Sequence, residues 1–236
     1  MKLLTQNDKM KRSSDGLYNI YNFTLPAFRP NDNGKQFSTH KALPKFTCPQ
    51  AKDCVAGCYA RQGAYRFSNV AKKHHRNLET ALSPEFESVL QLDLNKAIKQ
   101  SDRKKQSPLI RVHDSGDFFS LDYTLTWLRV MRLNPKVKFY AYTKSVELFK
   151  DLRDNFDLTP PTNFSLIYSL GGKQDSLINL ETDRHSKVFE TLEDLLAAGY
   201  ADASHNDLVA LGSNHKIGLV YHGGKNYKNT NWSKVS

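Results

Sequence analysis

Apolar residues recur along this chain in two alternating patterns from about residue 45 onward. Short runs rich in β-branched and aromatic residues alternate with longer stretches in which an apolar residue returns every three or four positions. The first pattern predicts strands and the second predicts amphipathic helices. Because strands and helices alternate, the pattern predicts an α/β fold with a mostly parallel sheet.

The predicted elements have clear start and stop signals. Ser83, Pro84, Ser120 and Ser145 stand where helices would begin, and Gly199 stands where one would end. Right-handed crossovers between successive strands would curl such a chain into a full or partial (β/α) barrel. Strands are expected at 46–47, 109–113, 137–142, 164–170 and 217–221, and helices at 84–98, 121–133, 145–156 and 188–198.

The chain is expected to form one domain, because no Pro-, Gly- or Ser-rich linker interrupts this alternation. Residues 1–44 are polar and rich in turn signals, which predicts an irregular N-terminal arm. Residues 45–224 are assigned to the α/β domain and residues 225–236 to a C-terminal tail.

Polar and glycine-rich segments follow the predicted strands. They include Asp114–Asp117, Thr143–Ser145, Gly171–Lys173 and His222–Gly224. Because parallel strands end at the same edge of a sheet, these segments predict a binding rim that could receive an anionic ligand. Asp114 and Asp117 are either a carboxylate pair at that rim or part of a turn.

Three cysteines, the whole complement of the chain, lie together in a C-x5-C-x3-C spacing at Cys48, Cys54 and Cys58. Three thiols cannot all form disulfides with one another, and free cysteines that only pack are usually dispersed in apolar runs. The cluster therefore predicts a metal site at the mouth of the domain.

The choice of metal lies between an iron–sulfur cluster and zinc. A structural zinc site needs four ligands, which here would require a histidine such as His74 or His75. A compact thiolate triplet suits a [4Fe–4S] cluster whose fourth iron has no thiolate, and this is the favoured prediction. The remaining candidates for a fourth ligand are rim histidines that only folding could bring near: His113, His205, His215 and His222.

The net charge of +10 permits a nucleic-acid partner, although a solvated surface rich in lysine explains it equally well. Tyrosines near the predicted rim would either stack on bases or pack within the protein. They are Tyr59, Tyr65, Tyr140, Tyr142, Tyr168 and Tyr221. No apolar run suggests a membrane span or a signal peptide, so a cytoplasmic location is expected.

Three segments together resemble the phage "gene product eighty-eight" family. They are Cys48–Tyr65, Arg111–Phe119 and Phe139–Ser145, and they occur in the order typical of that family. The resemblance implies a protein of a phage or other mobile element that works in the host cytosol.

More distantly, the layout resembles radical S-adenosylmethionine (SAM) enzymes, which place a three-cysteine loop after the first strand of a partial barrel. That resemblance implies that SAM binds the iron that has no thiolate ligand, here called the open iron. It places Ser115, Gly116 and Asp117 near the amino group of SAM. It further implies that Lys144 and Asp117 hold the carboxylate, amine or ribose. The chain departs from the usual C-x3-C-x2-C spacing, and its aromatic residue, Tyr59, follows the last cysteine instead of preceding it.

Two hypotheses follow from the sequence. The first is an iron–sulfur protein that could be a radical-SAM-like enzyme, with no catalytic residue assigned. The second is a basic nucleic-acid-binding protein with a structural zinc or iron–sulfur site.

Overall fold

The computed structural model describes residues 2–13, 15–27, 47–221 and 232. Within them the strands form one all-parallel sheet in the order β1-β2-β3-β4-β5-β7-β6, curled into a half-barrel. The strands are β1 (Tyr18–Asn22), β2 (Ser107–Arg111), β3 (Lys138–Thr143), β4 (Phe164–Ser169), β5 (His185–Phe189), β6 (Ala201–Asp202) and β7 (Lys216–Val220). The predicted α/β partial barrel is confirmed.

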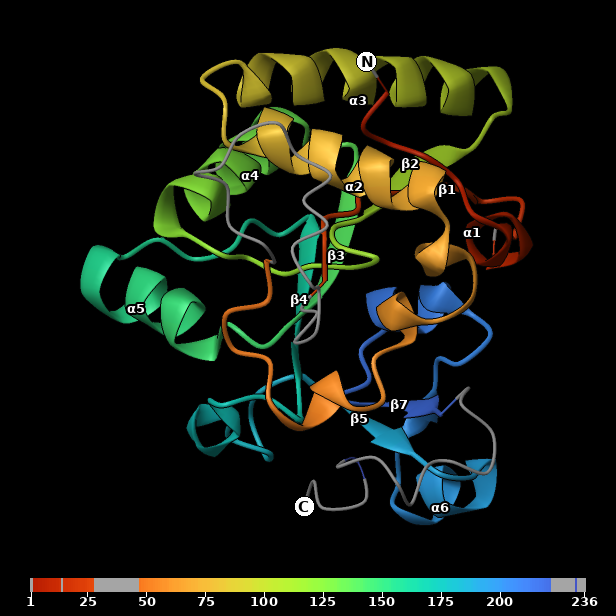
Figure 1. Cartoon of the computed structure of the whole chain (residues 1–236), viewed down its shortest axis with the longest axis vertical. Helices are drawn as coiled ribbons and strands as arrows, with labels where there is room; N and C mark the ends of the chain where they lie inside the picture. Colours follow the sequence, from red (N-terminus) through yellow and green to blue (C-terminus); the bar gives the residue numbers. More distant parts are fainter. Residues whose placement is uncertain (1, 14, 28–46, 222–231, 233–236) are drawn as a thin grey trace.

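Helices connect most of these strands. In Figure 1, α3 crosses the top of the view with α2 and α4 beneath it, and α6 lies at the opposite end. The α-helices are α1 (Asp8–Ser13), α2 (Ser68–Ala81), α3 (Phe86–Arg103), α4 (Leu121–Leu133), α5 (Val146–Phe156) and α6 (Leu192–Ala197). Short 3-10 turns are η1 (Asp53–Val55), η2 (Tyr59–Arg61), η3 (Gly63–Arg66), η4 (Asp175–Leu177) and η5 (Asp207–Leu211).

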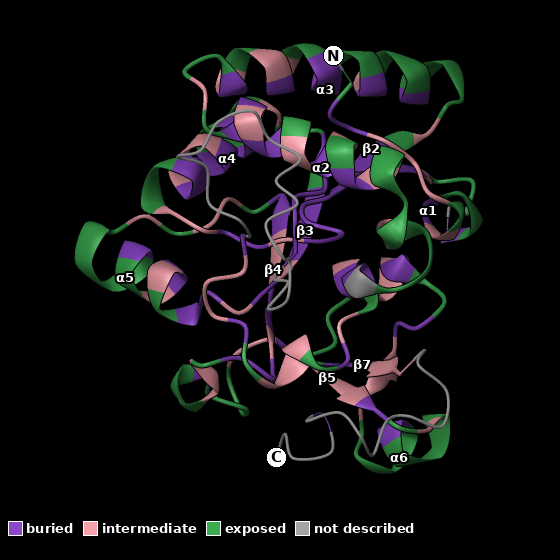
Figure 2. Cartoon of the chain, viewed as in Figure 1, coloured by how far each residue is buried: buried purple, intermediate pink, exposed green. Residues whose placement is uncertain are grey.

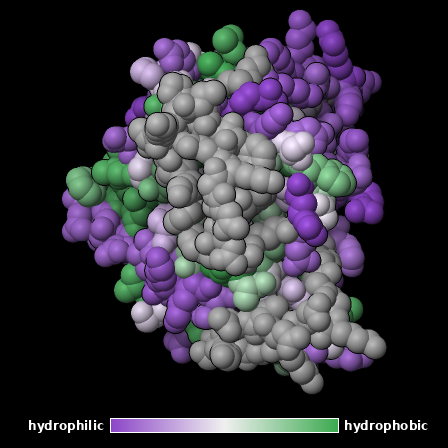
Figure 3. All heavy atoms as spheres, viewed as in Figure 1, coloured by the Kyte–Doolittle hydropathy of each residue, from purple (hydrophilic) through white to green (hydrophobic). Residues whose placement is uncertain are grey.

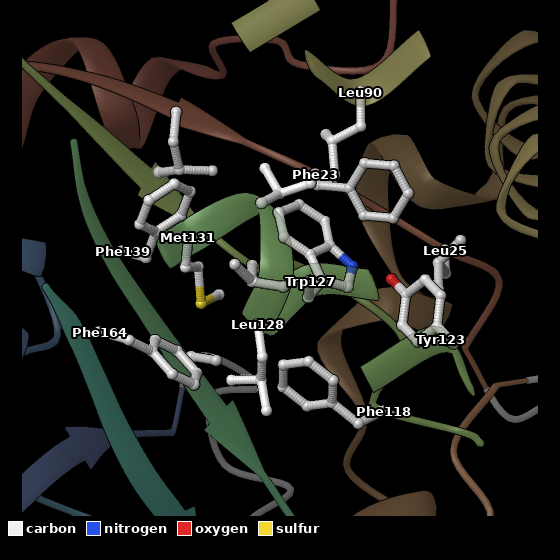
Figure 4. Packing of buried hydrophobic residues seen from close by; sticks show 14 of the residues in the cluster. Phe23, Leu25, Leu90, Phe118, Tyr123, Trp127, Leu128, Met131, Phe139 and Phe164 are labelled. Carbon is white, nitrogen blue, oxygen red and sulfur yellow. The ribbon is translucent and has the colours of Figure 1, made fainter. Parts of the chain in front are cut away.

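The larger hydrophobic core lies between the outer face of the sheet and the helices. Trp127 of α4 is fully buried there, and its ring lies 5.4 Å from that of Phe23 in an edge-on contact. Figure 4 shows Phe23, Phe118, Trp127 and Phe139 pointing toward one another from different elements. Figure 2 shows the same arrangement as buried strands beneath helices whose outer surfaces are exposed.

A second core fills the concave side of the half-barrel. Alternate strand residues point inward, and Ile20, Leu109, Tyr140, Ile167 and Ile217 form one apolar layer with Met10 of α1 and Ala210 of η5. The two short helical segments are joined across the opening, since the amide of Asp207 donates to the Ser13 hydroxyl over 3.3 Å. The half-barrel is therefore filled at its base, and space remains only toward the carboxyl ends of the strands.

Several predicted elements match the structure closely. Helix α4 spans 121–133 as expected, and the Ser120 hydroxyl accepts the amide hydrogen of Tyr123 over 3.4 Å. The predicted cap at Ser145 is wrong, because its hydroxyl donates to the carbonyl of Phe118 instead. The strand expected at 46–47 is absent at Thr47, and residue 46 lies outside the described residues.

Other segments depart from expectation. Residues 8–22, expected to be irregular, supply α1 and β1, whereas 28–44 lie outside the described residues. The helix expected at 188–198 is wrong in its first half, since 185–189 form strand β5, paired with β4 and β7. Of the predicted tail, only Trp232 is described.

Hydrophilic side chains cover much of the described part of the face seen in Figure 3, and hydrophobic ones gather beside α5. No described helix has both the length and the apolar composition needed to cross a bilayer.

Candidate metal centre and ligand pocket

A pocket of about 380 Å³ opens at the carboxyl edge of the sheet. Its walls come from the ends of β2, β3, β4, β5 and β7, from α1, and from the segment that carries the cysteines. This volume is in the range of small-molecule sites. A smaller hollow of about 150 Å³ between the N-terminal segment and α3 has no cysteine or histidine in its lining.

All three cysteines line this pocket, and each is half-buried. They lie on residues 47–60, here called the cysteine loop, which follows β1 and precedes α2. The backbone of this loop is held from two sides. The amide of Thr47 donates to the carbonyl of Pro26 over 3.0 Å, and the amide of Cys54 donates to the carbonyl of Gly171 over 3.1 Å.

All three cysteines line the pocket, and the choice between a cluster and a single ion stays a prediction. Among the described residues, no three His, Cys, Asp or Glu side chains lie close enough together to hold one metal ion. A [4Fe–4S] cluster distributes its thiolates over different irons and therefore needs wider spacing and adjoining space. The pocket beside Cys48, Cys54 and Cys58 provides that space, so the residues fit such a cluster.

The candidate fourth ligands are dispersed. His74 is buried in α2, where its ring lies 5.6 Å from that of Tyr65. Of the candidate histidines among the described residues, His113 alone lines the pocket. His222 lies outside the described residues.

Ser115 and Gly116 line the pocket and also support the cysteine loop. The Ser115 hydroxyl donates to the carbonyl of Leu25 over 2.6 Å. Gly116 has a φ of +88°, and a Cβ there would lie 2.5 Å from Oγ1 of Thr47. The loop after β2 therefore packs directly beneath the start of the cysteine loop.

Asp117 and Lys144 line the same pocket, but protein groups already engage their polar atoms. Asp117 accepts hydrogen bonds from the Thr143 hydroxyl over 2.6 Å and from the amide of Lys144 over 2.8 Å. Burial raises the pKa of the Asp117 carboxyl. The Lys144 ammonium donates to the Ser169 hydroxyl over 2.7 Å. A ligand would have to share these groups, and their role in binding stays a prediction.

Trp232 closes the pocket beside Lys144, whose ammonium lies 5.5 Å from the centre of the indole ring. The indole packs on Gly171, which has a φ of +91°, and a Cβ at that position would lie 2.5 Å from Cζ3 of Trp232. The glycine after β4 is therefore required both by the backbone and by this close approach.

A set of charged residues, here called the floor network, lies at this pocket: Lys9, Arg111 and Asp114 line it, and Asp207 pairs with Lys9 and Arg111 behind the lining. The sequence indicated Asp114 but not the set as a whole. Arg111 Nη1 lies 3.3 Å from Asp114 Oδ1 and 3.5 Å from Asp207 Oδ2, and Lys9 Nζ lies 3.0 Å from Asp207 Oδ1. Burial opposes the charge on Arg111, but the two carboxylates outweigh it and raise the Arg111 pKa. Burial likewise opposes ionisation of Asp207, yet Arg111 and Lys9 lower its pKa overall.

Asp114 also ties the floor network to η3, to β1 and to the segment before α1. Its Oδ2 accepts hydrogen bonds from the Tyr65 hydroxyl over 2.6 Å, from the Asn7 amide over 3.0 Å and from the Asn22 amide over 3.1 Å. Asp117, by contrast, accepts from Thr143 at the end of β3 and from Lys144, which follows it. The two carboxylates thus have separate sets of partners.

His113 directly precedes Asp114 in the chain and has a left-handed backbone conformation, with a φ of +67°. Its Nε2 lies 2.7 Å from the Tyr123 hydroxyl, and burial lowers the His113 pKa to about 3, so the ring is neutral at physiological pH. Its Nδ1 has no hydrogen-bond partner in the described part of the chain.

Known proteins similar to this chain come from mycobacteriophages. The chain is 32% identical over 148 residues to the Gene 88 protein of Mycobacterium phage L5, covering 58% of this chain and 62% of the relative. It is 30% identical over 148 residues, with the same coverage, to the Gene 88 protein of Mycobacterium phage D29. The alignment therefore spans about three fifths of these curated relatives.

No solved structure matches the chain, and the comparisons do not support the distant resemblance to radical SAM enzymes. A family model described as gene product 88 matches residues 1–233, nearly the full length. The chain therefore belongs to the gene product 88 family of phage proteins.

Proposed function

We propose that this phage protein binds an iron–sulfur cluster through Cys48, Cys54 and Cys58 and holds a ligand in the adjoining pocket. The observation that supports this proposal is that every cysteine of the chain lines that one pocket. Three thiolates would leave one iron of a [4Fe–4S] cluster without a cysteine ligand. An incomplete coordination shell facing a cavity is the arrangement of a ligand-binding metal site.

When bound, such a cluster supplies an electrophilic iron and a one-electron redox couple. The chain itself supplies the surroundings. The hydrogen bonds at Thr47 and Cys54 hold the cysteine loop in place, and Trp232 excludes water from one side of the pocket.

SAM is the candidate ligand of this proposal. The cysteine loop follows β1, the first strand of the half-barrel, which is the order found in radical SAM enzymes. Ser115, Gly116, Asp117 and Lys144 line the pocket where such a ligand would contact them. The C-x5-C-x3-C spacing differs from that of radical SAM enzymes, so SAM binding requires its own test.

The test is anaerobic purification and reconstitution, with iron, sulfide and zinc measured per chain. We expect about four irons and four sulfides per chain. Replacing any one cysteine by serine is expected to remove most of the iron. Lys52→Ala is the matched control, because Lys52 is an exposed residue of the same loop. The iron content of this variant should equal that of the wild type.

Electron paramagnetic resonance of the reduced protein, with and without SAM, tests the ligand. A spectrum that changes when SAM is added supports SAM binding at the iron that has no cysteine ligand. An unchanged spectrum contradicts SAM binding but leaves the proposed cluster standing. Stoichiometric zinc without iron would overturn the cluster and favour a zinc-stabilised protein.

A further inference from the structure

The floor of the pocket contains two hydrogen-bond donors that no described residue satisfies. They are the Nε–H of Arg111 and the hydroxyl of Tyr142, and both atoms are buried. The two side chains lie on neighbouring strands, β2 and β3, with the guanidinium carbon 5.6 Å from the centre of the tyrosine ring. Buried donors without partners cost free energy, so this pair indicates a ligand that accepts hydrogen bonds.

The charges of the floor network indicate that this ligand is neutral. Lys9 and Arg111 carry two positive charges, and Asp114 and Asp207 carry two negative charges at short distance. A carboxylate or phosphate placed here would meet two carboxylates that already neutralise Arg111, and burying an unpaired charge is costly. The carboxylates themselves are occupied, Asp114 by Tyr65, Asn7 and Asn22, and Asp207 by Lys9. A cation would therefore gain little binding free energy from these carboxylates.

The rest of the lining favours a flat ring. Tyr59 of the cysteine loop and Tyr65 of η3 line the pocket, with their ring centres 5.7 Å apart, and Tyr142 lies on the sheet. Val188 and Leu219 add an apolar wall from β5 and β7. Tyrosine rings and short apolar side chains around a few donors are typical of sites for planar heterocycles.

We propose that the floor of this pocket binds an uncharged heteroaromatic ring that carries an oxo group, the chemistry of a uracil, thymine or guanine base. The oxo oxygen has two lone pairs and accepts from Arg111 Nε–H and the Tyr142 hydroxyl. Such a base would come either from a free nucleoside or from a nucleic acid, whose phosphates the overall charge of +10 would attract. This inference does not depend on iron in the protein.

Calorimetric titration of the full chain with uridine and guanosine tests the proposal. Both are expected to bind, and adenosine, which has no oxo group, is expected to bind at least fivefold more weakly. Tyr142→Phe keeps the ring and removes the donor, and it should weaken uridine binding roughly fivefold. Tyr168→Phe is the matched control, because Tyr168 is a buried tyrosine of the neighbouring strand β4 that packs in the outer core and is not part of the pocket lining.

The source of the base is tested with an oligo-deoxythymidylate. If the oligonucleotide binds more tightly than thymidine, and Tyr142→Phe removes this difference, the natural ligand is a nucleic acid. If the two bind with equal affinity, the natural ligand is a free nucleoside. The proposal is overturned if Tyr142→Phe binds every ligand as the wild type does, or if neither nucleosides nor the oligonucleotide bind. Iron analysis of the same samples separates this result from the presence of the cluster.

Discussion

His113 and Gly116 lie in the segment that follows β2, and both have left-handed backbone conformations, with φ of +67° and +88°. Such conformations are uncommon outside glycine and concentrate at functional sites. Here they turn the chain sharply, so that Ser115 bonds to Leu25 and Gly116 packs against Thr47. The cysteine loop therefore rests on two individual residues whose backbones few other amino acids would tolerate.

Gly116→Ala is expected to destabilise the protein by about 2–4 kcal/mol, because the new Cβ meets Thr47 and Leu25 in a conformation that alanine disfavours. Gly63→Ala is the control, since Gly63 also has a positive φ but has no atom within 4 Å of the added carbon. Its cost should be about 1 kcal/mol. Urea unfolding of both variants measures the difference, and equal losses would contradict the packing role of Gly116.

The neutral state of His113 predicts a pH dependence of stability. In the unfolded chain the ring takes up a proton below pH 6.5, whereas in the folded protein the pKa is lowered to about 3. The unfolded state then binds more protons, so stability falls as the pH falls from 6.5 toward 3, by roughly 1.4 kcal/mol per pH unit. Between pH 8 and pH 5, His113 should account for a loss of roughly 2 kcal/mol.

His113→Asn should reduce this slope, because asparagine tolerates the left-handed conformation and does not titrate. The measurement is the free energy of unfolding of both proteins at pH 5, 6, 7 and 8. Parallel curves for the two proteins would show that folding does not lower the pKa of His113.

Local sequence patterns were sufficient to indicate the cysteines and the segment Ser115–Asp117, because the residues of each group lie close together in the chain. The same approach could not find the floor network. Arg111 and Asp207 are 96 positions apart, and Lys9 lies in a segment that reads as irregular. Only the curvature of the sheet brings these residues together.

At the scale of elements, α1 and η5 close the open side of the half-barrel. Met10 fills the inner layer, and Lys9 of α1 pairs with Asp207 of η5 at 3.0 Å. Burial there lowers the pKa of Lys9, with a further contribution from Arg111. Apolar, charged and hydrogen-bonded contacts together thus hold the short helix α1.

Asp207→Asn is expected to cost about 3–5 kcal/mol, because it leaves Arg111 and Lys9 buried with one carboxylate fewer. Asp8→Asn, on the same helix α1, removes an exposed pair in which Lys11 lies 3.8 Å away, and it should cost less than about 0.5 kcal/mol. Chemical unfolding distinguishes the two. A small effect of Asp207→Asn would mean that water reaches this pair.

The elements that the sequence predicted well are those with a single buried face. Helix α4 alternates buried and exposed residues at helical spacing and begins at a serine cap, so both of its ends were evident. Strand β5 contains His185, Ser186 and Lys187, whose polarity conceals a strand that is held by pairing on both sides. Helix α2 was missed because a basic run, Lys72–Arg76, interrupts its apolar positions.

At the scale of the whole molecule, the two tryptophans report on different regions. Trp127 is fully buried in the outer core, and Trp232 lines the pocket with the cysteines. In Trp127→Phe, which keeps only Trp232, iron loading should quench most of the fluorescence. In Trp232→Phe, the remaining emission should change less, because Trp127 does not line the pocket.

Adding Cys54→Ser to the Trp127→Phe variant is the control and should abolish the quenching. Equal quenching of the two single variants would place the bound iron away from the pocket that Trp232 lines.

The backbone of the cysteine loop is already hydrogen-bonded to Pro26 and Gly171 by protein groups alone. In a zinc finger the metal supplies the folding free energy, and the chain without it is unfolded. In the proposed cluster protein the sheet would supply that free energy instead, because it holds the cysteine loop through its backbone. Removal of the proposed cluster is therefore expected to leave the chain folded, so that a shortage of iron would lower the loaded fraction and not the amount of protein.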